Sequence, residues 1–354
     1  MIGGVAIGRN EGERLVACLK SLLRDADHVV YVDSGSTDGS VETARSMGVE
    51  VVELDMNKPF TAARARNEGF ARAREIGPGD RYVLFVDGDC EVVEEFVDAA
   101  LERLEDDDRL AAVCGRRRER YPEASSYNRL TDMEWETPIG EAESCGGDAL
   151  IRVEAFEDVN GYDASVIAGE EPEMCFRLRE KGWTIRRSNR EMTMHDAALT
   201  RFGQWWKRMV RAGHAAAEGM AMHGKSAERF NVHRTLRPVF WACVAPLFAV
   251  LLAPFTLGLS MVALVGLYGV QFARLWQRET ERKGWRNARL FAGFTVLGQF
   301  ALFAGVVKYW WGRWRGKRSA IIEYKGGACA TEGCCVHACG PPVGFGGSRW
   351  VRAC

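Results

Sequence analysis

The stretch 82–89, with the sequence Tyr-Val-Leu-Phe-Val-Asp-Gly-Asp, is the segment that decides the fold. Its apolar residues do not alternate with polar ones, which predicts a strand buried on both faces at the centre of a sheet. The apolar run stops at Asp87, and Asp89 follows after a single glycine. Because ligands of open α/β sheets bind beyond the carboxyl ends of the strands, both carboxylates are candidates for a binding site.

Residues 1–116 repeat this pattern of strand and helix. Runs rich in β-branched residues at 28–32, 49–54 and 110–114 alternate with segments of helical periodicity. Such alternation is typical of βαβ units, so we expect an α/β fold with a mainly parallel sheet and helices on both faces, in three layers. The segment 116–198 is more polar and irregular.

The overall charge is close to neutral, since 47 Lys and Arg residues offset 48 Asp and Glu residues. This balance indicates no nucleic-acid partner. The chain begins with an apolar, strand-like stretch that lacks the basic region and long apolar segment of a secretory signal, so we expect this part to stay in the cytosol. Single cysteines in apolar surroundings before residue 244 are typical of reduced, packed cysteines.

The composition changes beyond residue 237. Residues 238–273 carry no charged side chain. At about 1.5 Å rise per residue this stretch is too long for one membrane span and just long enough for a tight helical hairpin, whose first arm Pro246 and Pro254 would bend. Residues 290–307 are also uncharged and predict a third span or a re-entrant segment.

Basic residues flank each of these apolar stretches. By the positive-inside rule, those around the hairpin place both of its flanks in the cytosol, so we expect a cytoplasmic-membrane protein whose amino-terminal domain faces the cytosol. They are Arg229, Arg234 and Arg237 before the hairpin, and Arg274, Arg278, Arg282, Lys283, Arg286 and Arg289 after it. Further basic residues from Lys308 to Arg318 conflict with a simple third crossing.

The two carboxylates of the Asp-Gly-Asp motif suit a cation. Oxygen ligands favour Mg²⁺ or Mn²⁺, and such a cation can bridge the diphosphate of a nucleotide sugar and neutralise charge as the sugar leaves. Gly88 leaves room for the donor beside the backbone. For an isolated Asp-Gly-Asp, the alternative is a turn that caps the next helix.

Two further motifs are suited to a nucleotide diphosphate. Residues 32–40, Val-Asp-Ser-Gly-Ser-Thr-Asp-Gly-Ser, come at a strand end, and their acids can bind ribose or base. Residues 64–69, Arg-Ala-Arg-Asn-Glu-Gly, lie near a helix start and offer guanidinium groups that match phosphate oxygens. The alternative for residues 32–40 is a turn with a helix cap. The alternative for residues 64–69 is a pair of arginines on the surface of a helix.

A fourth motif, Gly-Glu-Glu-Pro-Glu at 169–173, carries a candidate base. Pro172 fits the first turn of a helix that ends near Gly182, so the glutamates gather at a positive helix amino terminus, which favours acids for structural reasons alone. Alternatively, one of them accepts the proton of an acceptor hydroxyl, because an alcohol needs a positioned base at neutral pH. We expect Glu171 in this role, with Glu170 beside it.

Taken together and in order, these motifs resemble glycosyltransferase family 2. The matching stretches span roughly residues 2–200, and several motifs in order are more specific than any one alone. They are 10–11, 32–39, 65–69, 87–89, Cys-Gly-Gly-Asp-Ala-Leu-Ile-Arg at 145–152, and 169–179. The resemblance implies a Rossmann-like nucleotide-diphospho-sugar transferase fold of the GT-A type and sugar transfer with inversion.

The resemblance also implies roles for individual residues. Positions matching Asp33 and Arg66 contact the nucleotide, those matching Asp87 and Asp89 contact nucleotide and metal, and Glu171 stands where the family has its base. The donor-binding set implied is Asn10, Glu11, Asp33, Ser34, Arg66, Asn67, Asp87 and Gly88, and the acceptor-side set is Gly146, Gly147, Asp148 and Trp205.

Three positions qualify this transfer of roles. The family often has Asp where Ser34 stands, which leaves base recognition open. Its usual Glu-Asp pair is Glu170-Glu171 here, so the second carboxylate reaches one methylene further. His195 lies where some relatives place a metal or diphosphate ligand, and a structural histidine is the alternative. The implied ligands of Mg²⁺ or Mn²⁺ are Asp87, Asp89 and His195.

The segment after residue 198 has the pattern of a membrane-surface helix. Apolar residues alternate there with basic ones, as in an interfacial amphipathic helix, and a core-packing helix is the alternative. The apolar positions are Phe202, Trp205, Trp206, Met209, Val210 and Gly213. The tail at 319–354 is rich in Cys and Gly, but its spacing fits no common zinc pattern, so we expect disorder and no metal there.

The sequence therefore predicts a catalytic domain at 1–198, an interfacial helix and linker at 199–237, a membrane-associated helical region at 238–318, and the tail. The expected function is metal-dependent transfer of a sugar from a nucleotide diphosphate to a hydroxyl of a lipid-linked or cell-envelope saccharide. One alternative is a scaffold of polysaccharide synthesis or export whose transferase domain has decayed, against which the intact acids argue. The other is a sugar nucleotidylyltransferase, whose usual Gly-rich, Lys-bearing loop residues 8–12 do not supply.

Overall fold

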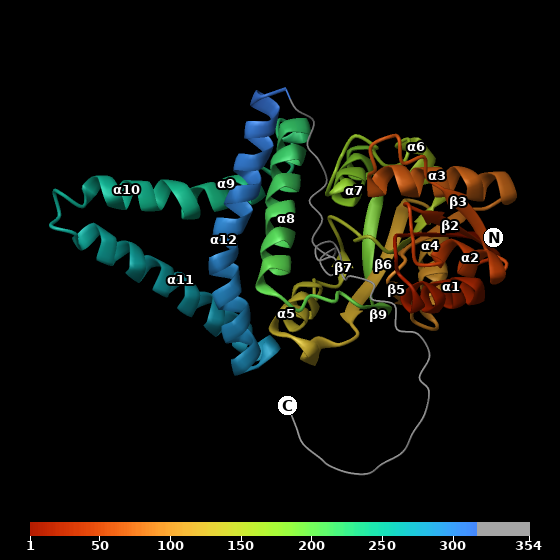
Figure 1. Cartoon of the computed structure of the whole chain (residues 1–354), viewed down its shortest axis with the longest axis horizontal. Coiled ribbons are helices and arrows are strands. Elements are labelled where there is room, and N and C mark those ends of the chain that lie inside the picture. Colours follow the sequence, from red (N-terminus) through yellow and green to blue (C-terminus); the bar gives the residue numbers. More distant parts are fainter. Residues whose placement is uncertain (317–354) are drawn as a thin grey trace, which may run out of the picture.

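The computed structural model describes residues 1–316 as a mixed α/β domain followed by a group of long helices (Figure 1). The expectations for the tail at 319–354 lie outside the described residues. The domain is built around one sheet. Its strands are β1 (Ile2–Gly8), β2 (His28–Asp33), β3 (Glu50–Glu53), β4 (Tyr82–Asp87), β5 (Cys90–Val92), β6 (Leu110–Glu119), β7 (Gly140–Glu141), β8 (Ala149–Arg152) and β9 (Thr184–His195).

The strand order is β3-β2-β1-β4-β8-β6-β9-β5, and β7 pairs with β9 outside this path. The predicted parallel arrangement holds for β3, β2, β1 and β4. The other half is mixed, because β8 is antiparallel to β4 and β6, and β5 is antiparallel to β9. In the parallel half, Gly8 pairs with Asp33 and Ile7 with Asp87, so three strand ends meet at one edge.

Helices cover both faces of the sheet, as predicted. Figure 1 shows α3, α6 and α7 on one side of the sheet, and α1 and α2 on the other. The fully buried Leu15, Leu19 and Leu22 fix α1 to the core. The helices of the domain are α1 (Glu13–Asp25), α2 (Ser40–Ser46), α3 (Ala62–Ile76), α4 (Phe96–Asp106), α5 (Ser126–Glu134), α6 (Val153–Asp158) and α7 (Glu170–Glu180), with a 3₁₀ turn at Pro122–Ala124.

Strand β6 is longer than predicted. The expected strand ended at residue 114, where the apolar run gives way to Gly-Arg-Arg-Arg-Glu, but β6 continues to Glu119 and pairs with β9 over that length. Charged residues can remain in this strand because some of them form buried ion pairs. Arg117 Nη2, for example, lies 2.7 Å from Asp148 Oδ2. Alternation along the strand then puts Arg117 and Glu119 on the same face.

The carboxyl-terminal region contains the predicted helical hairpin. Pro238 precedes a π-helical turn at Phe240–Val244 that joins its first two helices, Pro246 lies in the first turn of the second, and Pro254 falls in the loop instead of bending the arm. The helices are α8 (Phe202–His223), α9 (Val232–Val239), α10 (Ala245–Leu252), α11 (Leu259–Lys283) and α12 (Trp285–Trp314). Three described helical segments, 232–252, 259–283 and 285–314, are long and apolar enough to cross a membrane.

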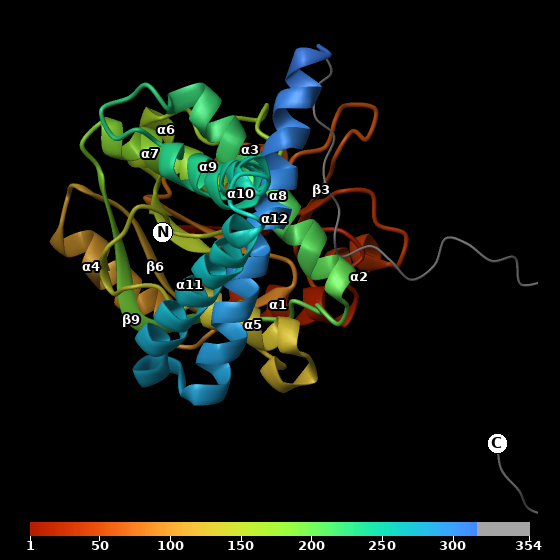
Figure 2. The ribbon, with the colours of Figure 1, turned by 90° about the vertical axis from the view of Figure 1, so that its left-hand side faces the viewer.

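Helices α8 and α12 lie side by side and cross at close backbone contact (Figure 1). A Cβ atom at Gly213 of α8 would stand 2.0 Å from the carbonyl oxygen of Leu302, and one at Gly305 of α12 would stand 2.1 Å from that of Val210. The apolar stripe of α8 therefore packs on α12. This is the core-packing helix that the sequence offered as the alternative to a membrane-surface helix. Helix α10 extends away from α12 to the left in Figure 1, crosswise to it, and points toward the viewer in Figure 2, so α12 is not aligned with this arm of the hairpin.

Candidate active site

The Asp-Gly-Asp motif lies at the end of β4, on the edge of a cavity of about 900 Å³. Strand β4 ends at Asp87, and the Gly88 backbone N–H donates to the carbonyl oxygen of Ile7 on β1 at 2.8 Å. A Cβ atom at Gly88 would stand 3.0 Å from that same oxygen, so the close approach of the two strands favours glycine. Asp87, Gly88 and Asp89 all line the cavity.

Arg66 connects two carboxylates of the cavity. Its Nη2 donates to Asp87 Oδ1 at 2.6 Å, and its Nη1 donates to Glu170 Oε1 at 2.8 Å. Burial alone would lower the pKa of the Arg66 guanidinium, but the charges of Asp87 and Glu170 outweigh it and raise that pKa. The positive charge at this point is therefore permanent, and it links α3, β4 and the start of α7.

Asp148 holds the backbone of Asp87 in place and does not itself line the cavity. This side chain is fully buried; its Oδ1 accepts from the Asp87 backbone N–H at 3.0 Å, and its Oδ2 accepts from the Thr193 hydroxyl at 2.7 Å. Asp148 therefore positions the Asp87 backbone in the present structure, and its place on the acceptor side stays a prediction. At the neighbouring Gly147, a Cβ atom would stand 2.7 Å from Asp87 Oδ2 and 3.1 Å from Arg66 Nη2, so glycine leaves room for that ion pair.

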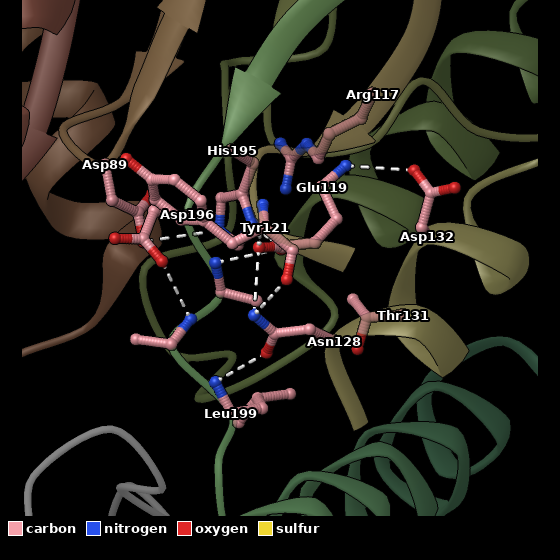
Figure 3. Close-up of polar contacts among 12 residues, drawn as sticks. Asp89, Arg117, Glu119, Tyr121, Asn128, Thr131, Asp132, His195, Asp196 and Leu199 are labelled. Atoms are coloured by element: carbon pink, nitrogen blue, oxygen red, sulfur yellow. Dashed lines mark hydrogen bonds and ion pairs between the residues drawn. The ribbon is translucent and has the colours of Figure 1, made fainter. Parts of the chain in front are cut away.

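His195 and Asp89 form a second buried group beside Asp87. His195 Nε2 lies 3.2 Å from Asp89 Oδ2, and both side chains are nearly inaccessible (Figure 3). Burial lowers the pKa of His195, so its imidazole is neutral and has a lone pair to offer a cation. Cys90 completes a set of groups with the spacing of metal ligands, but burial raises the pKa of its thiol well above the usual value. The donors that fit a divalent cation are therefore Asp89 and His195.

Glu119 faces the other side of the His195 ring. Its Oε2 lies 3.8 Å from His195 Nδ1, and that buried nitrogen has no hydrogen-bond partner among the described residues. The Glu119 carboxylate is held by the backbone N–H groups of Tyr121 and Ala197 and by the Asn128 amide (Figure 3). Glu119 and Arg117 were not among the predicted site residues; the alternation of Gly, Arg and Glu at 115, 117 and 119 is the signal that would have found them.

The turn after β2 forms the next part of the cavity edge. Ser34 lines the cavity, whereas Asp33 is buried and does not. Asp33 Oδ1 accepts from the Tyr31 hydroxyl at 2.9 Å, and Oδ2 accepts from the backbone N–H groups of Gly35 and Ser36. The Asp33 carboxylate therefore holds this turn in the present structure, and its contact with the nucleotide stays a prediction.

The loop after β1 lies against that turn. Asn10 Oδ1 accepts from the Thr37 backbone N–H at 2.7 Å, and the Asn10 backbone N–H donates to Ser36 Oγ at 2.9 Å. Asn10 and Glu11 both line the cavity, and their contact with a donor stays a prediction.

The remaining predicted residues lie away from the cavity. Asn67 forms two hydrogen bonds with the backbone of Tyr162, so it holds a loop and does not face the site. Trp205 has no exposed surface and packs with Leu130 and Phe294, so its predicted acceptor contact is corrected to core packing. Gly146 has a positive φ of 84°, a conformation that glycine adopts without strain.

Glu170 and Glu171 point in different directions. Glu170 lines the cavity beside Arg66. Glu171 does not: its Oε1 accepts from the Cys145 backbone N–H at 2.6 Å and from the Cys175 thiol at 3.0 Å. Burial raises the pKa of Glu171 above its ordinary value. The structure therefore turns the Glu170 side chain toward the cavity and the Glu171 side chain, which the sequence predicted to be the base, away from it.

Comparison with known proteins identifies relatives of this domain. Residues 7–159 match the model of glycosyl transferase family 2. The succinoglycan biosynthesis protein ExoA of Rhizobium meliloti (strain 1021) is 28% identical over 172 residues, which are 44% of this chain and 50% of that protein. The glycosyltransferase AglE of Haloferax volcanii is 21% identical over 248 residues, 66% of this chain and 77% of that protein. The chain thus spans half the length of the first of these relatives.

The fold has a solved counterpart. The mannosyltransferase PcManGT from Pyrobaculum calidifontis, whose structure was solved in complex with GDP-Man and Mn²⁺, superposes with a TM-score of 0.55 at 18% identity. The likeness covers 88% of this chain and 87% of that one. It confirms the GT-A type of α/β fold predicted from the sequence.

Proposed function

We propose, from the premise that residues 7–159 form a glycosyltransferase family 2 domain, that this chain transfers a sugar from a nucleotide diphosphate to an acceptor hydroxyl with inversion. The observation that carries the proposal is the convergence of Asp87, Asp89, Arg66 and Glu170 on one cavity. This cavity combines carboxylates for a cation, a permanent positive charge and a carboxylate that can take a proton.

The donor occupies the cavity edge formed by the strand ends. Ser34 and Asn10 border the nucleotide. Asp89 and His195 would hold Mg²⁺ or Mn²⁺, and the neighbouring Asp87 carboxylate would offer a further oxygen ligand. When bound, this cation neutralises the negative charge that develops on the departing diphosphate. Arg66 keeps the Asp87 carboxylate in place through the 2.6 Å contact. The solved counterpart with GDP-Man and Mn²⁺ supports the same class of donor and metal here.

Glu170 acts as the base. The acceptor oxygen attacks the anomeric carbon from the face opposite the diphosphate, its proton passes to the Glu170 carboxylate, and the bond from the anomeric carbon to the phosphate oxygen breaks. Arg66 orients this carboxylate through its second nitrogen, at 2.8 Å. Glu171 cannot take the proton from its present position, because its carboxylate is directed at Cys145 and Cys175.

The acceptor is a lipid-linked or cell-envelope saccharide at the cytoplasmic membrane, with the catalytic domain on the cytosolic side. The exposed apolar hairpin of α9 to α11 supports the proposed membrane location. The similarity to the succinoglycan biosynthesis protein supports the proposed class of acceptor. Helix α12 lies along α8 and not along the hairpin, so the basic residues at both of its ends can stay on the cytosolic side. An α12 that stays on the cytosolic side fits the basic residues at both of its ends.

A panel of nucleotide sugars tests the proposal. The purified full-length chain in detergent should release nucleotide from one class of donor when Mn²⁺ is added. The Asp89→Ala variant should be slower by orders of magnitude, because it loses charge stabilisation worth several kcal/mol. No release from any donor would favour the decayed scaffold, and release of pyrophosphate from a nucleoside triphosphate and a sugar phosphate would favour the nucleotidylyltransferase.

A further inference from the structure

The proposed transfer uses one cavity, whose two walls are the strand ends on the sheet side and helices α8 and α9 on the helix side. A second cavity, of about 850 Å³, lies between α5, α11 and the first half of α12, toward the lower end of α12 in Figure 1. Within residues 1–316 the two cavities have no lining residue in common. The second cavity therefore lies outside the site of the proposed transfer, and its own lining decides which ligand it suits.

The charged side chains that line the second cavity are arginines, and no acid from residues 1–316 lines it. They are Arg129, Arg286 and Arg289. Arg129 forms an ion pair with the exposed Glu123, whereas Arg286 and Arg289 form none with the described residues. The Arg289 guanidinium instead lies 5.4 Å from the centre of the Trp285 ring. The second cavity thus carries positive charge that is not balanced, which favours an anionic ligand.

Two buried nitrogen atoms of the lining residues also lack a partner. Trp276 Nε1 and Arg129 Nε form no hydrogen bond within the part of the chain that the structure describes. Both atoms can only donate, and a buried donor without an acceptor costs free energy. Helix α12 begins close by, at Trp285, whose ring centre lies 5.9 Å from that of Trp276, and no side chain caps its first turn. A ligand rich in oxygen atoms would satisfy these donors.

The second cavity lies where the apolar arm α11 becomes charged. Leu259 and Val265, in the first half of α11, are both 69% exposed. The first charged residue of α11 is Arg274, and Trp276 follows it. Tryptophan and arginine gather in this way where a membrane segment reaches the polar interface. With the hairpin in a membrane, the cavity is therefore at the level of the lipid head groups.

Apolar side chains lie beside the arginines of this cavity. Phe272 of α11 lines it together with Phe294 and Leu297 of α12, and Leu297 is 39% exposed. Tyr127 of α5 packs edge-on against Phe294, with ring centres 5.8 Å apart, which ties this part of α12 to the α/β domain. A free anion would use the arginines alone, whereas a lipid would use both the charged and the apolar part of the lining.

We infer that this cavity binds one anionic phospholipid of the bilayer, which fixes the α/β domain to the membrane surface. The lipid phosphate lies between Arg286 and Arg289, where the Trp276 N–H donates to it. An acyl chain follows the apolar side chains of α11 and α12. The charge of the cavity favours this occupant over a zwitterionic phospholipid, and its apolar part favours it over a free phosphate. The lipid is an anchor and not a substrate, because the cavity shares no described residue with that of the proposed transfer.

Titration of the purified full-length chain in detergent, followed by native mass spectrometry, measures this binding. Phosphatidylglycerol is the probe, with phosphatidylcholine and glycerol phosphate as comparison ligands. The unaltered chain should bind its first phosphatidylglycerol at least about tenfold more tightly than phosphatidylcholine, and glycerol phosphate more weakly than either. The Arg286→Gln, Arg289→Gln double variant should lose the preference for phosphatidylglycerol. Trp276→Phe removes the N–H donor and should weaken phosphatidylglycerol binding by about 2–10-fold.

The Arg274→Gln, Arg282→Gln double variant is the matched control, since it removes the same charge from exposed positions of α11 that do not line the cavity. It should prefer phosphatidylglycerol as strongly as the unaltered chain does. An equal loss of preference in both double variants would assign the effect to the total charge beside the membrane and overturn the inference. An undiminished preference in the Arg286→Gln, Arg289→Gln variant would also overturn it, as would binding of glycerol phosphate as tight as that of phosphatidylglycerol.

Discussion

The two walls of the cavity hold their charged groups in different ways. On the sheet side, Arg66, Asp87 and Glu170 form ion pairs at 2.6 and 2.8 Å that tie two helices to the central strand. On the helix side, Arg234 is largely exposed and Arg237 has no ionic partner among the described residues. The difference indicates that buried, paired groups fix the geometry of the sheet side, whereas the charged side chains of the helix side are less constrained.

The largest effect should appear on the sheet side, between the two adjacent glutamates. Glu170→Gln should lower kcat by about 10²–10⁴, because it removes the carboxylate that faces the cavity. Glu171→Gln should stay within about tenfold of the unaltered rate, since that carboxylate is turned away and its pKa is already raised. Nucleotide release in the presence of acceptor measures both. A greater loss in Glu171→Gln would show that α7 turns before the reaction.

The next effect concerns the group around His195. Glu119→Gln keeps the shape of the side chain but removes the negative charge that faces the imidazole, so Mn²⁺ affinity should fall by about 10–100-fold. Electron paramagnetic resonance of free Mn²⁺ measures this without catalysis. Glu123→Gln, at an exposed position near by in the sequence, is the control and should bind Mn²⁺ normally. Unchanged affinity in Glu119→Gln would remove Glu119 from the site.

The helix side depends on the contact between α8 and α12. Gly213→Ala should lower the free energy of unfolding by about 1–3 kcal/mol, because the new methyl group meets the Leu302 carbonyl oxygen at 2.0 Å. Gly203→Ala lies on the same helix with no atom within 4 Å, so its Tm should be unchanged or higher. Thermal unfolding in detergent compares the two. Equal Tm values would mean that the helices do not cross at Gly213.

The smallest effect is a pH dependence in the same helix. Burial raises the pKa of Glu218 on α8 to about 7, above the ordinary value of 4.5. As the pH rises from 4.5 to 7, the unfolded chain releases this proton and the folded chain retains it, so stability falls across that window and stays lower above it. Glu218→Gln should therefore raise Tm by about 2–4 °C above pH 7 and by less near pH 4. A difference in Tm that does not change with pH would contradict this.

The sheet side was largely predictable from the sequence, because a strand end fixes where a side chain goes. Asp87 and Asp89 follow an unbroken apolar run, and both line the cavity as expected. Arg66 was predicted from its motif near a helix start and also lines it. The motifs do not reveal the backbone partners of two buried carboxylates: Asp33 accepts from the Gly35 N–H, and Asp148 accepts from the Asp87 N–H.

The direction of a side chain on a helix was harder to predict. Glu170 and Glu171 are adjacent at the start of α7, but Glu170 pairs with Arg66 at the cavity while Glu171 accepts from Cys145. No local pattern encodes that choice, since both are acids at a helix amino terminus. Likewise, the apolar stripe around Trp205 fits a membrane surface or a partner helix equally well, and only the small residues Gly213 and Gly305 distinguish the partner.

In the proposed function, a cation held at the end of β4 is shared with the diphosphate of the donor. The most direct test is Mn²⁺ binding by the full-length chain, measured by electron paramagnetic resonance with and without UDP or GDP. One of these nucleotides should tighten Mn²⁺ binding in the unaltered chain, and Asp89→Ala should abolish the tightening. Mn²⁺ binding that is indifferent to both nucleotides, or that survives unchanged in Asp89→Ala, would contradict the account.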